Sequence, residues 1–435
     1  MSAIEDRARL TGPRFGGRRL LGQLLLVAMR VSSTMSKFLL AIYTARYLGL
    51  ADLGIYGLLV GATVIVPAIV GLGMTDWIVR KIVDLPRAQA LPLIASRLSL
   101  TLSIHLVVQP LVLAADVLLG EPIPLRIAVL AGAILMLENL GCEAADMLIA
   151  RRRVFLSYWL TFLRSGFWPI PVMAIGLLYP ETRTLEFLLL GWLAMLGVSW
   201  LILFGLVVPE GRWRQMRPHW RLLFHELRGS LVLYIKDVSS TIGMFLDRFL
   251  ISLFLGLELA GVYTLFWSIG NVVHSLAING VLLAQLPLLI ASANNADRAE
   301  FRALERRLQI EIGTWALLLA LGAAIATPLL LPYLGRPLVE ESLPIFWIVL
   351  FASLLRVAAD AYGYVLLALN RDRAIATIAV AGALASAGMN LVLTPLIGLW
   401  GAAIAFAFTS GGLFTARYFF SRTRTFSIGE CPAKS

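Results

Sequence analysis

The sequence predicts an all-α polytopic membrane protein, with twelve transmembrane helices in two six-helix lobes that are related by a pseudo-two-fold axis and surround a central cavity. Of the 435 residues, 59% are hydrophobic and only 14% are charged. Soluble globular domains are about 45–50% apolar and about 25% charged, so the chain lies outside that class. The mean hydropathy of +0.84 also excludes a disordered chain, because disorder requires low hydrophobicity and high charge.

Twelve segments are each apolar over about 20 residues, which is the length that a helix needs to cross the hydrocarbon core. Turn-forming and polar residues separate them, and even the longest polar stretches, 76–92, 209–228 and 291–308, are too short for a soluble domain. This excludes an enzyme with an appended catalytic domain. The expected spans are 20–48, 51–75, 93–118, 125–149, 157–179, 186–208, 229–256, 260–290, 309–334, 343–369, 374–395 and 399–420.

Basic residues predict how the spans are oriented. With the N-terminus in the cytoplasm, the cytoplasmic segments hold 25 Lys and Arg residues, and the external loops hold three, Arg126, Arg183 and Arg336. Basic loops stay on the cytoplasmic side of a membrane, where they also anchor to the anionic leaflet of the lipid bilayer. We therefore expect a multi-pass protein of a bacterial inner (plasma) membrane with both termini in the cytoplasm. The net charge of +11 follows from this topology, and we expect no binding to nucleic acid.

An internal repeat relates the two halves of the chain. Residues 31–56 and 238–263 align without a gap, with 11 identities in 26 positions that include Val-Ser-Ser-Thr at the start and Gly-x-Tyr at the end. The first span therefore matches the seventh, and each half has six spans. Because each repeat unit has an even number of spans, both units have the same orientation in the membrane. This predicts a pseudo-two-fold axis along the membrane normal and alternating access to a shared cavity. We expect the N-terminal lobe at 1–228 and the C-terminal lobe at 229–435.

Charged side chains within the spans must face protein or water, because each costs about 2.5–3.5 kcal/mol at mid-bilayer on insertion scales. At 100° per residue, Arg30 and Lys37 lie on one stripe of the first span, and that span supplies no acid to pair with them. Cations that line a cavity suit an anionic substrate, and Arg can bind phosphate through two nitrogens. The expected substrate-binding residues are Arg30, Ser33, Thr34, Lys37, Lys236, Arg248 and Asn271.

Acidic residues within the spans are candidates for coupling transport to an ion gradient. Glu138 and Asp146 lie in one sector of the fourth span, and Asp237 and Asp247 lie on or beside the polar stripe of the seventh. One unit charge that moves down a potential of 100 mV supplies about 2.3 kcal/mol. The movement of one or two such charges would therefore supply enough free energy to drive a transport cycle in one direction.

Two further patterns concern structure and cofactors. Arg356 and Asp360 are four residues apart in the tenth span, a spacing that favours a structural ion pair on one helix face. The sequence contains no nucleotide-binding loop, no nucleophile elbow and no cluster of metal ligands. Cys142 and Cys431 do not make a disulfide framework. We expect no cofactor, no metal and no enzymatic activity.

Two motifs resemble a known family. Residues 45–56, ARYLGLADLGIY, resemble the first-hairpin signature of polysaccharide and O-antigen flippases, which belong to the multidrug/oligosaccharidyl-lipid/polysaccharide exporter superfamily. Residues 397–405, IGLWGAAIA, are similar to the start of that family's last helix. The resemblance implies translocation of undecaprenyl-diphosphate-linked oligosaccharides for O-antigen, capsule or exopolysaccharide biosynthesis, coupled to an ion gradient. It also implies a polysaccharide polymerase or other assembly proteins as partners.

Other functions remain open on the sequence. A multidrug exporter of the same superfamily would favour an acidic, aromatic-lined cavity, whereas the first span is basic. A major-facilitator-type solute carrier is suggested by residues 73–81, although they lack the second Gly of that family's loop motif. A membrane scaffold would not explain charged stripes in both halves. A membrane-embedded enzyme would need paired catalytic groups, for which the candidates are Glu138, Glu143 and Asp146.

Overall fold

The computed structural model describes residues 17–118, 124–207, 220–294 and 298–422. Within these ranges the regular secondary structure is helical, and no strand occurs. Among the described residues, twelve helices are long and apolar enough to cross a membrane, and each coincides with one predicted span. The basic residues of 1–16 and 209–219, together with Cys431, lie outside the described ranges.

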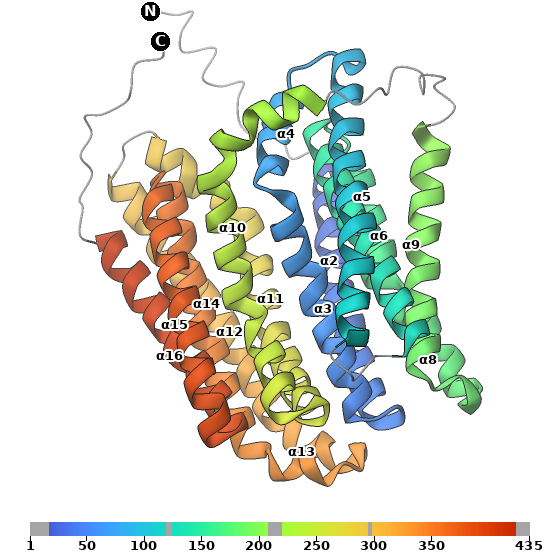
Figure 1. The fold of residues 1–435 in the computed structure, drawn as a ribbon. Coiled ribbons are helices and arrows are strands. Elements are labelled where there is room, and N and C mark those ends of the chain that lie inside the picture. The colour runs from blue at the N-terminus through green and yellow to red at the C-terminus, as the bar shows by residue number, and fades with distance from the viewer. Residues whose placement is uncertain (1–16, 119–123, 208–219, 295–297, 423–435) are drawn as a thin grey trace, which may run out of the picture.

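The first six spans form the N-terminal lobe, coloured blue to green in Figure 1. The fifth span is interrupted by η1, a π-helical turn that ends just before Pro169. Such turns are frequent at functional sites, and this one brings Arg164 into the lobe interior. The elements are α2 (Gly17–Tyr47), α3 (Leu50–Gly71), α4 (Met74–Ile82), α5 (Arg87–Leu118), α6 (Leu125–Ala150), α7 (Val154–Phe162), η1 (Leu163–Phe167), α8 (Pro169–Leu178), η2 (Pro180–Thr182) and α9 (Leu185–Val207).

The last six spans form the C-terminal lobe, coloured yellow-green to red in Figure 1. The predicted lobe boundary after residue 228 falls inside α10, which begins at Trp220. The short helices α4 and α13 were not expected from the sequence, and they lie at opposite ends of the helix bundle (Figure 1). The elements are α10 (Trp220–Leu255), α11 (Leu257–Asn294), α12 (Arg298–Leu334), α13 (Pro337–Glu341), α14 (Leu343–Ala368), α15 (Asp372–Ile397) and α16 (Leu399–Arg422).

The lobes meet where α3 crosses α11, at positions that the repeat relates to one another. A side chain on Gly54 would overlap the backbone of Leu257, and a side chain on Gly261 would overlap the backbone of Leu50. Gly54 corresponds to Gly261, and Leu50 to Leu257, at the offset of 207 residues. Reciprocal contacts of this kind are the mark of a two-fold interface. The crossing therefore lies on the pseudo-two-fold axis that the repeat predicts.

Arg336 makes a second contact between the lobes, at the end of the bundle where α13 lies. Its Nε donates to the carbonyl oxygen of Ala45 at 3.0 Å, and its Nη2 donates to that of Arg46 at 3.3 Å. These carbonyls belong to the last turn of α2, where the helix dipole is negative. The contact thus joins the C-terminal lobe to the end of the first span.

Stacked aromatic rings support the N-terminal side of this interface. The indoles of Trp168 and Trp192 are parallel within 8°, with ring centroids 5.0 Å apart. The ring of Tyr56 packs beside them, at 6.4 Å from Trp168 and 6.1 Å from Trp192. All three side chains are buried, so α3 is fixed against the fifth and sixth spans at the point where it faces the other lobe.

Candidate functional site

A cavity of about 260 Å³ lies between the lobes, and we name it the interlobe cavity. Helices α2 and α3 supply one wall, and α10 and α11 supply the other. Because the wall helices come from both lobes, a ligand in this cavity touches both. Five of the seven predicted substrate-binding residues line it, namely Ser33, Thr34, Lys37, Arg248 and Asn271.

The described lining of the interlobe cavity carries two basic side chains, Lys37 and Arg248, and no acidic one. Arg248 is only 1% exposed, and neither its Nε nor its Nη2 has a hydrogen-bond partner. Lys37 forms no ion pair with another described residue, and nearby Glu138 is already paired with Arg164 at 2.9 Å. Neither cation forms an ion pair with another described residue, although the Asp247 carboxylate is adjacent to Arg248 outside the cavity lining, and a buried charge that is incompletely paired is unfavourable. The interlobe cavity is therefore suited electrostatically to an anion.

Aromatic rings hold the Arg248 side chain in place. Its Cζ lies 3.7 Å from the ring centroid of Trp267 and 5.0 Å from that of Phe245. Cation–π contacts contribute about 0.5–2 kcal/mol, and they leave the guanidinium charge in place. Sequence reasoning missed Trp267 because the contact joins two different helices and has no local pattern.

A second pocket, of about 460 Å³, adjoins the interlobe cavity, since Ser33 and Thr34 line both. We name it the hydroxyl chamber, because hydroxyl groups from α2, α7 and η1 recur around it. Arg30 lies here and not in the interlobe cavity. Its guanidinium donates a hydrogen bond to the Tyr158 hydroxyl, and Cζ lies 4.8 Å from the centre of the Tyr158 ring.

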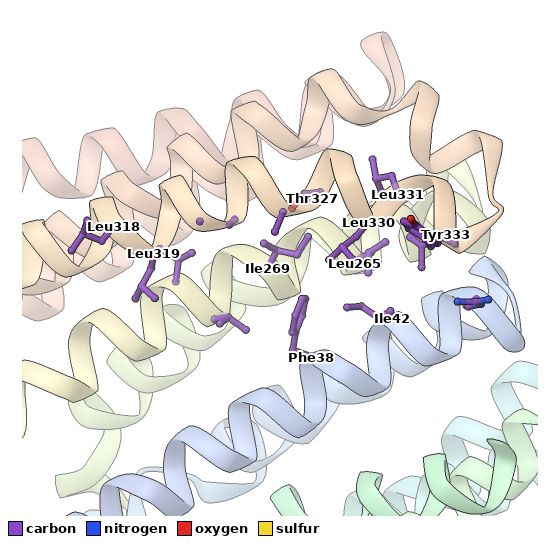
Figure 2. A pocket seen from close by; sticks show the side chains of 17 residues that line it. Phe38, Ile42, Leu265, Ile269, Leu318, Leu319, Thr327, Leu330, Leu331 and Tyr333 are labelled. Carbon is purple, nitrogen blue, oxygen red and sulfur yellow. The ribbon is translucent and has the colours of Figure 1, made fainter. Parts of the chain in front are cut away.

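An apolar groove of about 440 Å³ lies between α2, α11 and α12, and it also adjoins the interlobe cavity, because Phe38 and Val272 line both. Figure 2 shows Phe38 and Ile42 of α2 facing Ile269 of α11, with the α12 side chains across from them. Leu318 is 56% exposed, so the groove opens on the outer, apolar surface of the bundle. That surface would face lipid in a membrane.

A cavity of about 120 Å³ within the C-terminal lobe, which we name the C-lobe cavity, contains charged residues of α10, α14 and α16. The expected ion pair between Arg356 and Asp360 is not formed. Asp360 instead binds Arg417 at 2.5 Å and His274 at 2.8 Å. These partners lie on α16 and α11 and approach Asp360 from across the lobe, whereas Arg356 makes no ion pair with a described residue.

The four acids that the sequence suggests for ion coupling are dispersed. Asp247 is buried at the C-lobe cavity, and Glu138 is buried in the N-terminal lobe. Asp146 lines the hydroxyl chamber, and Asp237 lies at the start of the seventh span. The structure therefore does not gather them into one cluster. The side chain of Lys236 lies outside the described part of the structure.

A buried ion pair in the N-terminal lobe was missed in the sequence. Arg97 is completely buried and pairs with Glu143, whose carboxylate also accepts hydrogen bonds from the Thr101 hydroxyl at 2.8 and 2.9 Å. Arg97 is the single Lys or Arg of the expected span 93–118. A lone cation in a span needs an acidic partner on another helix, and this was the signal in the sequence for the pair.

No family model and no curated protein matches the sequence, but solved structures match the fold. An inward-facing multidrug resistance transporter of the MATE family, in the MOP superfamily, aligns with a TM-score of 0.69 at 15% identity, over 92% of this chain and 97% of the other. The chain has the fold of the MATE transporters. The twelve helices in two lobes are those of that fold.

Two further transporter structures of the MOP superfamily are similar to this chain. A MOP-superfamily transporter from Pyrococcus furiosus, described as having a binding pocket of reversed polarity that suggests a different function, aligns with a TM-score of 0.61 at 15% identity, over 92% of this chain and 95% of the other. An outward-facing multidrug resistance MATE transporter aligns with a TM-score of 0.59 at 15% identity, over the same shares.

Proposed function

We propose that the protein is an alternating-access flippase for undecaprenyl-diphosphate-linked oligosaccharides in surface polysaccharide biosynthesis. The observation that carries the proposal is the interlobe cavity, whose described lining has two cations and no acid and which adjoins the apolar groove. An anionic head and a long apolar tail on one molecule fit these two adjoining compartments. The flippase-like motifs at 45–56 and 397–405 support the same substrate class.

The two cations lie on different lobes, Lys37 on α2 and Arg248 on α10. A diphosphate held by the Lys37 ammonium and by two nitrogens of Arg248 would bridge the lobes. When the lobes rock about the crossing of α3 and α11, the two cations separate and the grip on the diphosphate weakens. The head is then released on the far side, while the prenyl chain stays in lipid at the gap between α2 and α12.

Ion coupling would act through the C-terminal lobe. The Asp247 carboxylate accepts a hydrogen bond from the backbone N–H of Arg248 at 2.8 Å, so the two charged residues are linked directly. A proton or cation that reaches Asp247 through the C-lobe cavity would raise the positive potential at Arg248. Binding of the anion and of the coupling ion would therefore favour each other.

The test is deletion of the gene followed by complementation. We expect the deletion strain to accumulate lipid-linked oligosaccharide on the cytoplasmic leaflet and to lose surface polysaccharide, and the wild-type gene to restore it. Lys37→Met and Arg248→Met should fail to restore it at equal expression, whereas Arg80→Met, an exposed cation on α4, should succeed. Normal polysaccharide with Arg30→Ala, Lys37→Ala and Arg248→Ala would contradict the proposal.

The structural comparisons favour a second candidate, a multidrug antiporter, because two of the similar structures are multidrug resistance transporters. The aromatic side chains of Tyr56, Phe245 and Trp267 in the interlobe cavity would suit a planar drug. A cationic drug, however, would meet Lys37 and Arg248 without a compensating acid. Increased susceptibility of the deletion strain to cationic drugs, with unchanged lipid-linked oligosaccharide, would establish this candidate in place of the first.

A further inference from the structure

The hydroxyl chamber differs in charge from the interlobe cavity that it adjoins. Its two arginines already have partners in the protein, since Arg30 donates to the Tyr158 hydroxyl and Arg164 pairs with Glu138 at 2.9 Å. The chamber also contains a carboxylate, Asp146. A second phosphate group is therefore favoured here less than in the interlobe cavity, where Arg248 has unpartnered nitrogens.

Neutral polar groups dominate the rest of the chamber. The side chains of Thr161, Ser165 and Asn279 line it and make no hydrogen bond to another described residue. The hydroxyls of Ser33 and Ser157 donate to backbone carbonyls at 2.8 Å, so their oxygens remain free to accept. The chamber thus offers hydrogen-bond donors and acceptors and does not require a charged ligand. A polyhydroxylated ligand binds through groups of this kind.

Ring faces and size agree with this ligand class. Tyr158 and Phe162 contribute aromatic rings to the chamber wall. Arg30 covers one face of the Tyr158 ring, whereas the electron-rich face of a ring such as that of Phe162 attracts C–H groups. The volume of about 460 Å³ falls within the range of roughly 300–1,000 Å³ that is usual for ligand sites. Along α2, Arg30 and Lys37 are seven residues apart, which is about 10 Å, so one extended ligand can reach both compartments.

We propose that the hydroxyl chamber is a saccharide subsite, which binds the first sugars of the oligosaccharide while Lys37 and Arg248 hold its diphosphate. This assignment rests on the proposed flippase function. The three compartments then follow the order of the three parts of the substrate. The hydroxyl chamber takes the sugar, the interlobe cavity takes the diphosphate and the apolar groove takes the prenyl chain, and each compartment shares two lining residues with the next.

The experiment compares two ligands on the purified full-length protein in lipid nanodiscs. One is undecaprenyl diphosphate, which has no sugar, and the other is the lipid-linked oligosaccharide extracted from cells in which the gene is deleted. We expect wild type to bind the oligosaccharide form more tightly. The double variant Thr161→Val/Ser165→Ala should lose about tenfold in affinity for that form and bind undecaprenyl diphosphate as wild type does. Asn279→Leu, on the other lobe, should have the same selective effect.

The matched control removes two hydroxyls elsewhere, in Ser99→Ala/Thr415→Val, where both hydroxyls bond only to their own helix. It should leave both affinities unchanged. If the chamber variants leave binding of the oligosaccharide form unchanged, or weaken both ligands equally, the saccharide subsite is wrong although the flippase proposal stands. If wild type binds neither ligand, or if Arg248→Met binds undecaprenyl diphosphate as wild type does, the flippase proposal itself fails.

Discussion

The repeat-related segments of the two lobes agree in how they pack and disagree in where they carry charge. Gly54 and Gly261 make the same close contact from opposite sides. The charged residues have no such counterparts, because Lys37 corresponds to Met244 and Arg248 to Ala41. The lobes have therefore kept a common interface, while each supplies a different cation to the cavity between them.

This difference separates the packing positions that the two lobes share from the charges that would bind the substrate in the proposed function. A symmetric pair of cations would place equal charges at equal heights on the two walls. Here Lys37 lies one turn before the position that corresponds to Arg248, so the pair is staggered along the membrane normal. A staggered pair suits an elongated diphosphate better than a single compact anion.

The largest expected effect comes from removing the charges that differ between the lobes. Lys37→Met/Arg248→Met should weaken binding of undecaprenyl diphosphate by at least about 30-fold, because truncating a buried charged partner costs about 2–5 kcal/mol. Binding to the purified protein in nanodiscs measures this. Arg80→Met/Lys81→Met removes two cations from exposed positions on α4, and an equal loss there would show that the effect is non-specific.

Substitution of the two glycines at the crossing of the lobes, Gly54 and Gly261, should lower stability by similar amounts. Gly54→Ala and Gly261→Ala each place a methyl group against the backbone of the other lobe, and such overpacking costs about 1–3 kcal/mol. Gly280→Ala, in open space on α11, should instead be neutral or stabilising by up to about 1 kcal/mol. Unfolding in mixed micelles compares the three variants. If Gly54→Ala and Gly261→Ala resembled Gly280→Ala, the crossing would not be the tight contact described.

Substitution of the two tyrosines that the repeat relates, Tyr56 and Tyr263, should have different effects on stability. Tyr263 donates a hydrogen bond from its hydroxyl to Asp247 at 2.6 Å, whereas its counterpart Tyr56 makes no hydrogen bond to another described residue. Tyr263→Phe should lower the free energy of unfolding by about 1–3 kcal/mol, because it leaves a buried carboxylate short of a donor. Tyr56→Phe should change it by less than about 0.5 kcal/mol. Equal effects would mean that the hydrogen bond from Tyr263 to Asp247 contributes nothing measurable to stability.

The smallest expected effect concerns Arg336, whose bonds to Ala45 and Arg46 hold the lobes together at one end. Arg336→Leu should weaken that contact by about 0.5–1.5 kcal/mol and increase the population with separated lobes. The distance between spin labels at Tyr179 and Glu341, exposed positions on the two lobes, should then lengthen in part of the sample. An unchanged distance distribution would show that Arg336 does not restrain the lobes.

The sequence was sufficient for the fold because the determinants of the fold are local. Each span is apolar along its own length, and the repeat is visible in consecutive residues such as Val238 to Thr241. Helical spacing also placed Lys37 on the stripe of α2 that lines the interlobe cavity. These features depend on neighbours within one or two turns.

The partners of charged residues could not be predicted in the same way. Spacing on one helix suggested Arg356 for Asp360, but the observed partner, Arg417, is 57 residues away. Arg30 likewise meets Tyr158 at a separation of 128 residues. Such pairs are decided by how helices pack, and several partners on different helices satisfy the same local pattern.

The most direct test of the central claim is flipping in proteoliposomes. The substrate is the lipid-linked oligosaccharide extracted from the deletion strain, and the measurement is the fraction that a glycan-modifying reagent reaches from outside. Wild type is predicted to move the substrate between leaflets, and Lys37→Met/Arg248→Met is predicted to leave it where it was inserted. Equal movement with both proteins, or none with wild type under an imposed proton or sodium gradient, would contradict the account.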